Sequence, residues 1–171
     1  STDAGDTWKV LSRGGESDFH ALTASSKGVM GFDGALSATP DGTTWSLGDP
    51  TMKPFSLAAA PDGSQVLATT EQGLHSSADG GRTWTKVALA PLLLLTAWAD
   101  SKTVVGVTPE GGLALSTDAG RTWLPAAGKV TKPSAVSASR DKAGLLEILV
   151  VTDSAVLQSR DDGATFTDLK S

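Results

Sequence analysis

A phrase of about eight residues recurs five times along this chain and constrains its fold more than any other feature. The copies share Asp and Gly and close on Thr followed by an aromatic residue. The closing aromatics lie 37, 39, 39 and 43 residues apart, at Trp8, Trp45, Trp84, Trp123 and Phe166. A repeat of roughly 40 to 45 residues with strand-like content is typical of one four-stranded propeller blade. Helical repeats of this length need apolar residues spaced by about 3.6, and the chain lacks that pattern.

The phrase itself predicts a tight turn that leads into a strand. An Asp side chain bonds the backbone that follows it, and Gly accepts positive φ at little cost. Thr and Trp then suit the half-buried surface of a strand. We therefore expect each phrase to be a hairpin tip, fixed by its Ser and Asp and anchored in the core by its aromatic. The aspartates with this structural role are Asp3, Asp41, Asp79, Asp118 and Asp161.

Four of the five copies match S-x-D-x-G-x-T-[WF] at every fixed position. This pattern resembles the Asp-box, or BNR repeat, of sialidases, sortilin-like receptors and photosystem II assembly factors. In the second copy one residue is missing, so that Asp41 and Gly42 are adjacent. The resemblance implies that each box joins the third and fourth strands of a blade, away from the substrate face. It also implies that the box aspartates are neither catalytic nor metal-binding.

A second resemblance concerns the layout of the chain. The stretches 18–22 and 111–116, each followed within its repeat by a box, are similar to exported bacterial BNR-repeat proteins of a glycosylhydrolase-like type. Proteins of this type are commonly exported or lipid-anchored. The similarity therefore implies an extracytoplasmic location, in the cell envelope or outside the cell.

Aligning the repeats predicts an all-β fold, a β-propeller with four complete four-stranded antiparallel blades. First strands are expected at 19–24, 55–60, 93–98 and 134–139, and second strands at 28–32, 65–69, 103–107 and 146–151. Third strands lead into the boxes, and fourth strands begin at each closing aromatic. The blades then span about 18–50, 51–90, 91–128 and 129–171.

The segment 1–17 is expected to be a hairpin of a preceding blade, because Ser1 opens a box. Unpaired strand edges on such a hairpin would favour aggregation. We therefore expect this chain to be the C-terminal part of a larger propeller, with the missing N-terminal blades as its partner. A self-sufficient four-bladed ring with an extra hairpin is the alternative.

Composition and charge exclude several classes of function. Hydrophobic residues make up 39% of the chain and charged residues 19%, as in ordinary globular proteins. A net charge of −5 offers no footprint for a phosphate backbone, so we do not expect nucleic acid as a partner. The absence of Cys removes disulfides, zinc thiolate sites and thiol catalysis. The apolar run 89–98 is too short for a membrane span and reads as an inner strand.

The inventory of side chains argues against a sialidase mechanism. That mechanism uses a Tyr nucleophile and three arginines on the substrate, but the chain has no Tyr, and three of its five arginines lie within boxes. A general glycosidase needs only two carboxyl groups about 5 to 9.5 Å apart in unequal environments. Acids are plentiful in the chain, so this class stays open.

An acid occurs at the turn between the second and third strands of every blade. These acids precede the closing aromatics by 12, 13, 13 and 13 residues, and they are Asp33, Glu71, Glu110 and Asp153. In a propeller this turn lies on the face opposite the boxes, so the four carboxylates could attract a cation, an amine or a basic partner. The alternative interpretation is that each is a solvated turn residue.

Three further residues are candidates for ligand binding. His20 lies on an innermost strand and could project into the central channel beside Asp18, although packing is the alternative. Trp98 ends a first strand where other blades carry small residues, and it could stack on a sugar or fill the core. The two histidines, His20 and His75, have no His or Cys neighbours, so we expect neither a metal site nor a cofactor.

Taken together, these features predict a non-catalytic binding or scaffold propeller of an exported bacterial protein, with a carbohydrate or protein ligand. A glycoside hydrolase whose site is completed by missing blades is one alternative. An assembly factor like those of photosystem II is another, and the acidic balance of the chain argues against the basic patch that it would need.

Overall fold

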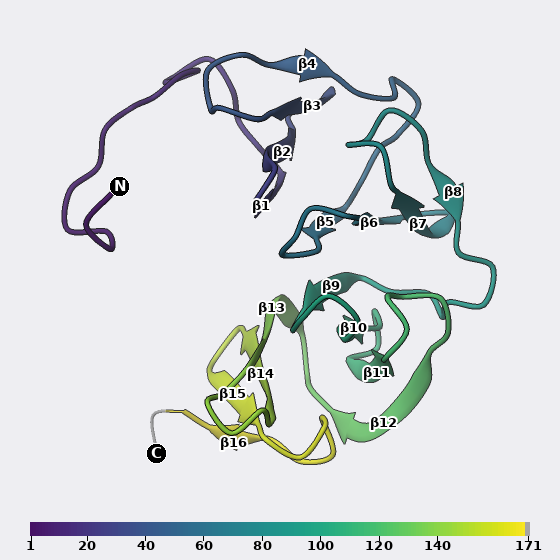
Figure 1. Cartoon of the computed structure of the whole chain (residues 1–171). Helices are drawn as coiled ribbons and strands as arrows, with labels where there is room; N and C mark the ends of the chain where they lie inside the picture. The colour runs from purple at the N-terminus through teal and green to yellow at the C-terminus, as the bar shows by residue number, and fades with distance from the viewer. Residues whose placement is uncertain (170–171) are drawn as a thin grey trace.

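The computed structural model describes residues 1–169 and confirms the predicted all-β class. Sixteen strands form four antiparallel sheets of four strands each, and each sheet is one blade of a β-propeller. Within a blade the strands pair in chain order, so every connection is a hairpin. Figure 1 shows the four blades following one another around an arc, with the first strand of each blade innermost.

The strands of each blade run from the hub outwards. Blades 1 and 2 comprise β1 (Ala21–Ser25), β2 (Gly28–Phe32), β3 (Leu36–Thr39), β4 (Ser46–Leu47), β5 (Ser56–Ala59), β6 (Val66–Thr70), β7 (Gly73–Ser77) and β8 (Thr85–Lys86). Blades 3 and 4 comprise β9 (Leu95–Trp98), β10 (Val104–Val107), β11 (Gly112–Ser116), β12 (Leu124–Lys129), β13 (Pro133–Arg140), β14 (Leu146–Thr152), β15 (Val156–Ser159) and β16 (Thr167–Asp168).

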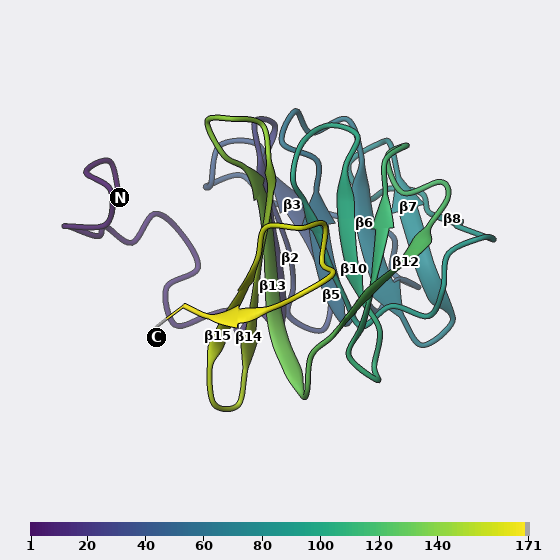
Figure 2. The same cartoon turned by 90° about the horizontal axis from the view of Figure 1, so that it is seen from below.

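Antiparallel pairing places the turns on two opposite faces of the molecule. The turns that join second to third strands lie at one end of the sheets, together with the starts of the inner strands; we call this the hairpin face. The repeated phrases join third to fourth strands at the other end, which we call the repeat face. Figure 2 shows the sheets from the side, with the β14–β15 hairpin projecting at one end.

The hydrophobic core lies between neighbouring blades rather than within one of them. Successive residues of a strand point to opposite faces of its sheet, so each middle strand serves two interfaces. On β10, Val104 packs in the cluster shared with blade 2, and Val105 packs in the cluster shared with blade 4. A Cβ on Gly106 would lie 2.7 Å from Leu93 and 2.9 Å from Trp123, so this close packing requires glycine.

The repeated phrases form the hydrogen-bonded turns that their residues predict. In the fourth copy the Ser116 hydroxyl donates to Asp118 at 2.8 Å and accepts the Gly120 N–H at 2.8 Å. Asp118 in turn accepts the Thr122 N–H at 2.9 Å and its hydroxyl at 2.6 Å. The Trp123 indole N–H then closes the turn on the Gly120 carbonyl at 3.0 Å. The copies that begin at Ser1 and Ser77 repeat all of these bonds, and the copy at Ser159 repeats the serine and aspartate bonds.

The shortened second copy keeps its Asp turn but changes the partner of its tryptophan. Thr39 replaces the serine, and its hydroxyl accepts the Gly42 N–H at 2.9 Å. The Trp45 indole donates instead to the Ser12 hydroxyl at 3.0 Å. This bond between Trp45 and Ser12, found only in the shortened copy, links the N-terminal segment to blade 1.

The N-terminal segment differs from the hairpin expected over 1–17. It contains turns but no strand among its described residues, and Trp8 is 81% exposed. From Ser12 onwards the segment packs on blade 1. The Arg13 guanidinium lies 4.5 Å from the centre of the Trp45 ring, and Phe19 stacks on that ring at 5.4 Å.

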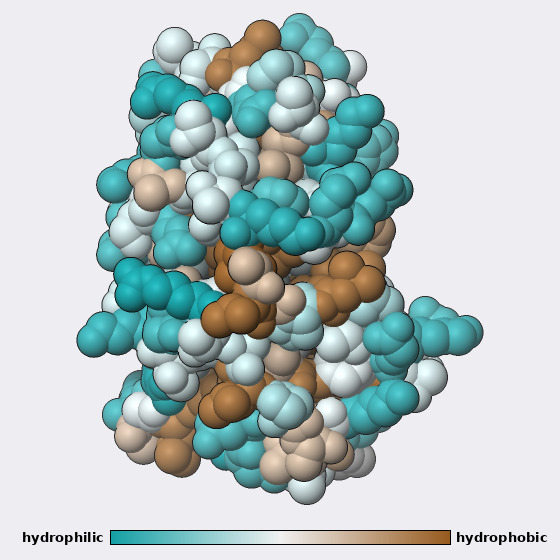
Figure 3. Space-filling view, turned by 90° about the vertical axis from the view of Figure 1, so that its right-hand side faces the viewer, coloured by the Kyte–Doolittle hydropathy of each residue, from teal (hydrophilic) through white to brown (hydrophobic). Residues whose placement is uncertain are grey.

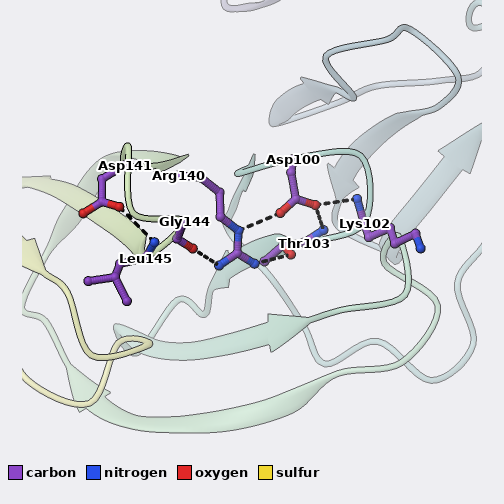
Figure 4. A network of polar contacts seen from close by, with 7 residues as sticks. All are labelled: Asp100, Lys102, Thr103, Arg140, Asp141, Gly144 and Leu145. Carbon is purple, nitrogen blue, oxygen red and sulfur yellow. Dashed lines mark hydrogen bonds and ion pairs between the residues drawn. The ribbon is translucent and has the colours of Figure 1, made fainter.

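A polar clamp joins blades 3 and 4 at the repeat face (Figure 4). Arg140 at the end of β13 donates through Nε to Asp100 at 2.8 Å and through Nη2 to the Thr103 hydroxyl at 2.9 Å. Burial of Asp100 raises its pKa, but the bonds from Arg140 and from the Lys102 and Thr103 N–H groups outweigh this effect. The pKa of Asp100 is therefore lowered, and the carboxylate stays ionised against the guanidinium.

Candidate functional site

The inner strands of the four blades surround a cavity of about 570 Å³ at the hub. Its wall combines residues at the start of β1, β5, β9 and β13, including His20, Phe55, Leu95, Thr96 and Ser134. The His20 N–H donates to the carbonyl of Phe32 at 2.8 Å, which places His20 at the hairpin face. We refer to this space as the hub cavity.

Two properties of the hub cavity are unusual for a structural void. Phe55 and Leu22 line it while remaining 62% and 57% exposed, so they offer apolar surface to a partner. The Thr96 side chain is 5% exposed, and its hydroxyl has no hydrogen-bond partner. Leaving a buried hydroxyl unpaired costs free energy, so a partner that bonds Thr96 would recover that cost.

A second hollow of about 690 Å³ adjoins the hub cavity on blade 2. The linings of the two spaces share Pro54 and Phe55, which lie at the boundary between them. The second hollow is more polar, and we call it the blade-2 hollow. Its lining includes Asp49, Lys53, Glu71, Gln72, His75 and Trp84.

His75 of β7 lines the blade-2 hollow. Its Nδ1 lies 3.3 Å from the Gly73 carbonyl and 3.4 Å from the Thr70 hydroxyl. These contacts hold the imidazole ring beside the β6–β7 turn.

Asp49 is a hydrogen-bond acceptor in the same hollow. The Thr51 hydroxyl and N–H donate to Asp49 at 2.7 and 2.8 Å, and these bonds hold the pKa of Asp49 below its usual range. Asp49 therefore remains a carboxylate. Glu71 is exposed at the β6–β7 turn and has no ion-pair partner within the described part of the chain.

The four acids at the turns between the second and third strands of the blades do not form one site. Asp33 lies 3.5 Å from Arg13, and a bond from Ser17, together with Ala35 and the Arg13 charge, lowers the pKa of Asp33. Asp153 pairs with Lys132 at 2.9 Å. Of the four acids, Glu71 alone lines the blade-2 hollow; Glu110 is exposed and lines neither of the two spaces.

No group of three or more metal-ligating side chains occurs within residues 1–169.

The remaining candidates have different positions. Asp18 is exposed at the start of blade 1, and His20 lines the hub cavity. Trp98 is 8% exposed between blades 2 and 3, and its indole N–H donates to the Ala58 carbonyl at 3.0 Å. Trp98 belongs to the buried cluster between these blades, so it fills the core and is not available to stack on a sugar.

The structure adds residues that the sequence pattern did not single out. Phe55 and Thr96 define the hub cavity, and Asp49 and His75 contribute to the blade-2 hollow. Phe55 had a detectable signal, because it is an aromatic at the start of a first strand. Nothing in the repeat pattern marks Thr96, whose unpaired hydroxyl is evident only after the neighbouring blades are in place.

A separate apolar area lies on the outer rim, where Figure 3 shows hydrophobic side chains gathered on one side of the molecule. The exposed residues Leu89, Leu92 and Leu124 belong to the outer parts of blades 2 and 3. A groove of about 530 Å³ runs there between residues 88–91 and Trp123. It carries few polar groups and no unpaired buried hydroxyl among the described residues.

Within the part of the chain that the structure describes, no helix is long and apolar enough to cross a membrane.

Comparison with known proteins identifies the fold but not the family. No protein-family profile and no curated protein sequence matches this chain. Among solved structures, YCF48 from Cyanidioschyzon merolae is 18% identical, with a TM-score of 0.60 over 90% of this chain and 56% of its own length. YCF48 bound to a D1 peptide is 16% identical, with a TM-score of 0.61 over 89% and 54%.

An ancestral GH74 enzyme is also similar, at 15% identity and a TM-score of 0.67 over 90% of this chain and 24% of that enzyme. The chain thus spans little more than half of these structures at most. At such low identity the likeness shows a shared propeller fold alone.

Proposed function

We propose that this chain is a non-catalytic binding propeller that holds an extended polypeptide segment at the hub cavity. The observation that carries the proposal is the pairing of exposed apolar side chains with the unpaired hydroxyl of Thr96 in one cavity. An extended peptide suits such a wall, because its side chains cover apolar surface while its backbone groups bond a buried hydroxyl. The similarity in fold to YCF48 bound to a D1 peptide supports a protein ligand.

A glycoside hydrolase is the second candidate, because Asp49 and Glu71 line one hollow and GH74 enzymes share the fold. Its general acid would need a raised pKa. Every carboxyl shift resolved among the described residues is a lowering instead, so the charges favour binding over acid catalysis. An assembly factor of the photosystem II type is one form that a binding role could take.

We further propose that the repeated turns are Asp-boxes and that additional blades cover the free side of blade 4. The serine, aspartate and tryptophan bonds of the turns support the first point. The second rests on β14, where Val151 is 40% exposed although Val107, at the same position in blade 3, is fully buried. Export from the cell stays a prediction of the sequence.

The binding proposal is tested by probing an array of short printed peptides with the labelled protein and three variants. Phe55→Ala removes the aromatic wall, Thr96→Val removes the hydroxyl, and Leu124→Ala on the outer rim is the control. We expect wild type and control to bind the same subset of peptides, and Phe55→Ala to weaken binding by about tenfold or more.

Thr96→Val has a distinctive signature, because it should weaken peptide binding while raising the free energy of unfolding by about 1–3 kcal/mol. Binding that survives Phe55→Ala and Thr96→Val but not Leu124→Ala would place the ligand elsewhere. An array on which no peptide binds contradicts the proposal. Release of reducing sugar from xyloglucan, the substrate class named for a GH74 xyloglucanase from Xanthomonas campestris with the same fold, would favour the hydrolase instead.

A further inference from the structure

The blade-2 hollow presents hydrogen-bond acceptors to a ligand. Glu71 and Asp49 supply carboxylate oxygens to its lining. Lys53 is the one cation in its lining, so the carboxylates outnumber it. A group that fits this surface must donate several hydrogen bonds and carry positive charge, as an ammonium or guanidinium does.

Aromatic surface strengthens this preference. Phe55 is 62% exposed at the boundary between the two spaces, and the half-buried Trp84 lines the hollow. The Trp84 indole N–H already donates to the Gly81 carbonyl at 3.2 Å, so its ring rather than its N–H remains for a ligand. Cations bind the faces of such rings, by about 0.5–1 kcal/mol where the ring is exposed.

The hub cavity has a ligand-binding feature of its own. Thr96, buried and without a hydrogen-bond partner, lines the hub cavity, and Phe55 lines both the hub cavity and the blade-2 hollow. A ligand in the hub cavity that covers Phe55 therefore lies next to the blade-2 hollow. The net charge of −5 favours the approach of a basic segment to the molecule.

We propose that the blade-2 hollow takes the side chain of a Lys or Arg in the bound peptide, whose apolar residues occupy the hub cavity. This inference rests on the proposed function, because it assigns a charge preference to the same peptide. Glu71 and Asp49 pair with the cation, and Phe55 contacts both parts of the ligand. Glu110, at the same turn of blade 3, does not line the blade-2 hollow and takes no part.

The experiment uses an array in which every peptide is printed with Lys, Arg, Gln or Glu at one position. The protein is applied as wild type, as Glu71→Gln and as Glu110→Gln, which makes the same change of charge at the matched turn. Both acids are exposed, so neither variant should disturb folding. We expect Lys and Arg peptides to bind about three- to tenfold more tightly than their Gln partners.

Glu71→Gln should reduce that preference, and Glu110→Gln should leave it unchanged. Peptides that bind without preferring Lys or Arg overturn this inference and leave the proposed function intact. An equal loss in both variants also overturns it, because the preference would then arise from the overall charge. If no peptide binds at all, the proposed function fails as well.

Discussion

Each complete repeated turn depends on one serine hydroxyl. Ser77, Ser116 and Ser159 are almost fully buried, and each bridges an aspartate carboxylate and the N–H of the turn glycine. An aspartate alone could bend the chain, but the serine also satisfies a backbone donor that burial would leave unpaired. The pattern of the sequence predicts this arrangement because every bond is local to one phrase.

Ser116→Ala should therefore lower the free energy of unfolding by about 1–3 kcal/mol, because the Gly120 N–H loses its acceptor inside the protein. Urea denaturation of the two proteins measures the difference. Ser1→Ala is the control, since the first turn makes the same bonds in full solvent. Equal losses in both variants would mean that burial of the serine is unimportant.

The turn aspartates also predict how stability depends on pH. Bonds from the Thr122 hydroxyl and N–H lower the pKa of Asp118 from 3.8 to about 2, and Asp79 and Asp161 behave alike. Because the folded pKa lies below the unfolded one, this stabilisation is complete above pH 3.8 and is lost as the pH falls towards 2. The melting temperature should drop across that window, and Asp118→Asn should make the drop smaller. A melting temperature that is constant down to pH 2 would contradict these pKa values.

The sequence predicted the positions of the strands, because each strand forms its hydrogen bonds with strands that are adjacent in the chain and belong to the same blade. The second strand of blade 3, expected at 103–107, is β10 at Val104–Val107. The fourth strands were less predictable in length. Three of them contain two residues, whereas β12 contains six after a register shift between Gly112 and Ala114.

The site was harder to predict than the strands, because the exposure of a side chain depends on its contacts with the neighbouring blade. Trp98 lies at the end of a strand, and it is buried because it packs on blade 2, where its indole N–H donates to the Ala58 carbonyl. The acids Asp33 and Asp153 are equivalent to Glu71 in the repeat, yet they form ion pairs with Arg13 and Lys132, whereas Glu71 has no such pair among the described residues. A repeat alignment predicts position along a strand and not the contacts that cross between blades.

The clamp between blades 3 and 4 gives a prediction at this scale. Arg140→Met keeps an unbranched apolar stem but removes the bonds to Asp100, Thr103 and Gly144. We expect a loss of about 1 kcal/mol, because the pair is partly exposed, and faster hydrogen exchange of the β13 amides. Arg160→Met, which breaks a pair within blade 4, is the control. Unchanged exchange in β13 would show that apolar packing alone holds the two blades.

At the scale of the whole molecule, the four blades form an arc, and the free side of blade 4, which faces away from blade 3, has no neighbouring sheet among the described residues (Figure 1). Val151, Leu149 and Val156 repeat the positions by which blade 3 packs on blade 4. Apolar surface of this kind favours association. The chain by itself should therefore show concentration-dependent self-association in sedimentation experiments.

Val151→Lys should suppress that association without lowering the melting temperature, since Val151 is already 40% exposed. Leu124→Lys, on the separate apolar area of the outer rim, is the comparison. If Leu124→Lys rather than Val151→Lys produces a monomer, the rim and not the free side of blade 4 is the surface that associates.

Binding of a peptide in the hub cavity is tested most directly by a crystal structure of the protein with the peptide that binds most tightly on the array. We expect an extended peptide between the inner strands, with a backbone group bonded to the Thr96 hydroxyl and Phe55 covered. A peptide lying instead along the outer rim beside Leu89 and Trp123, with the Thr96 hydroxyl still unpaired, would contradict it.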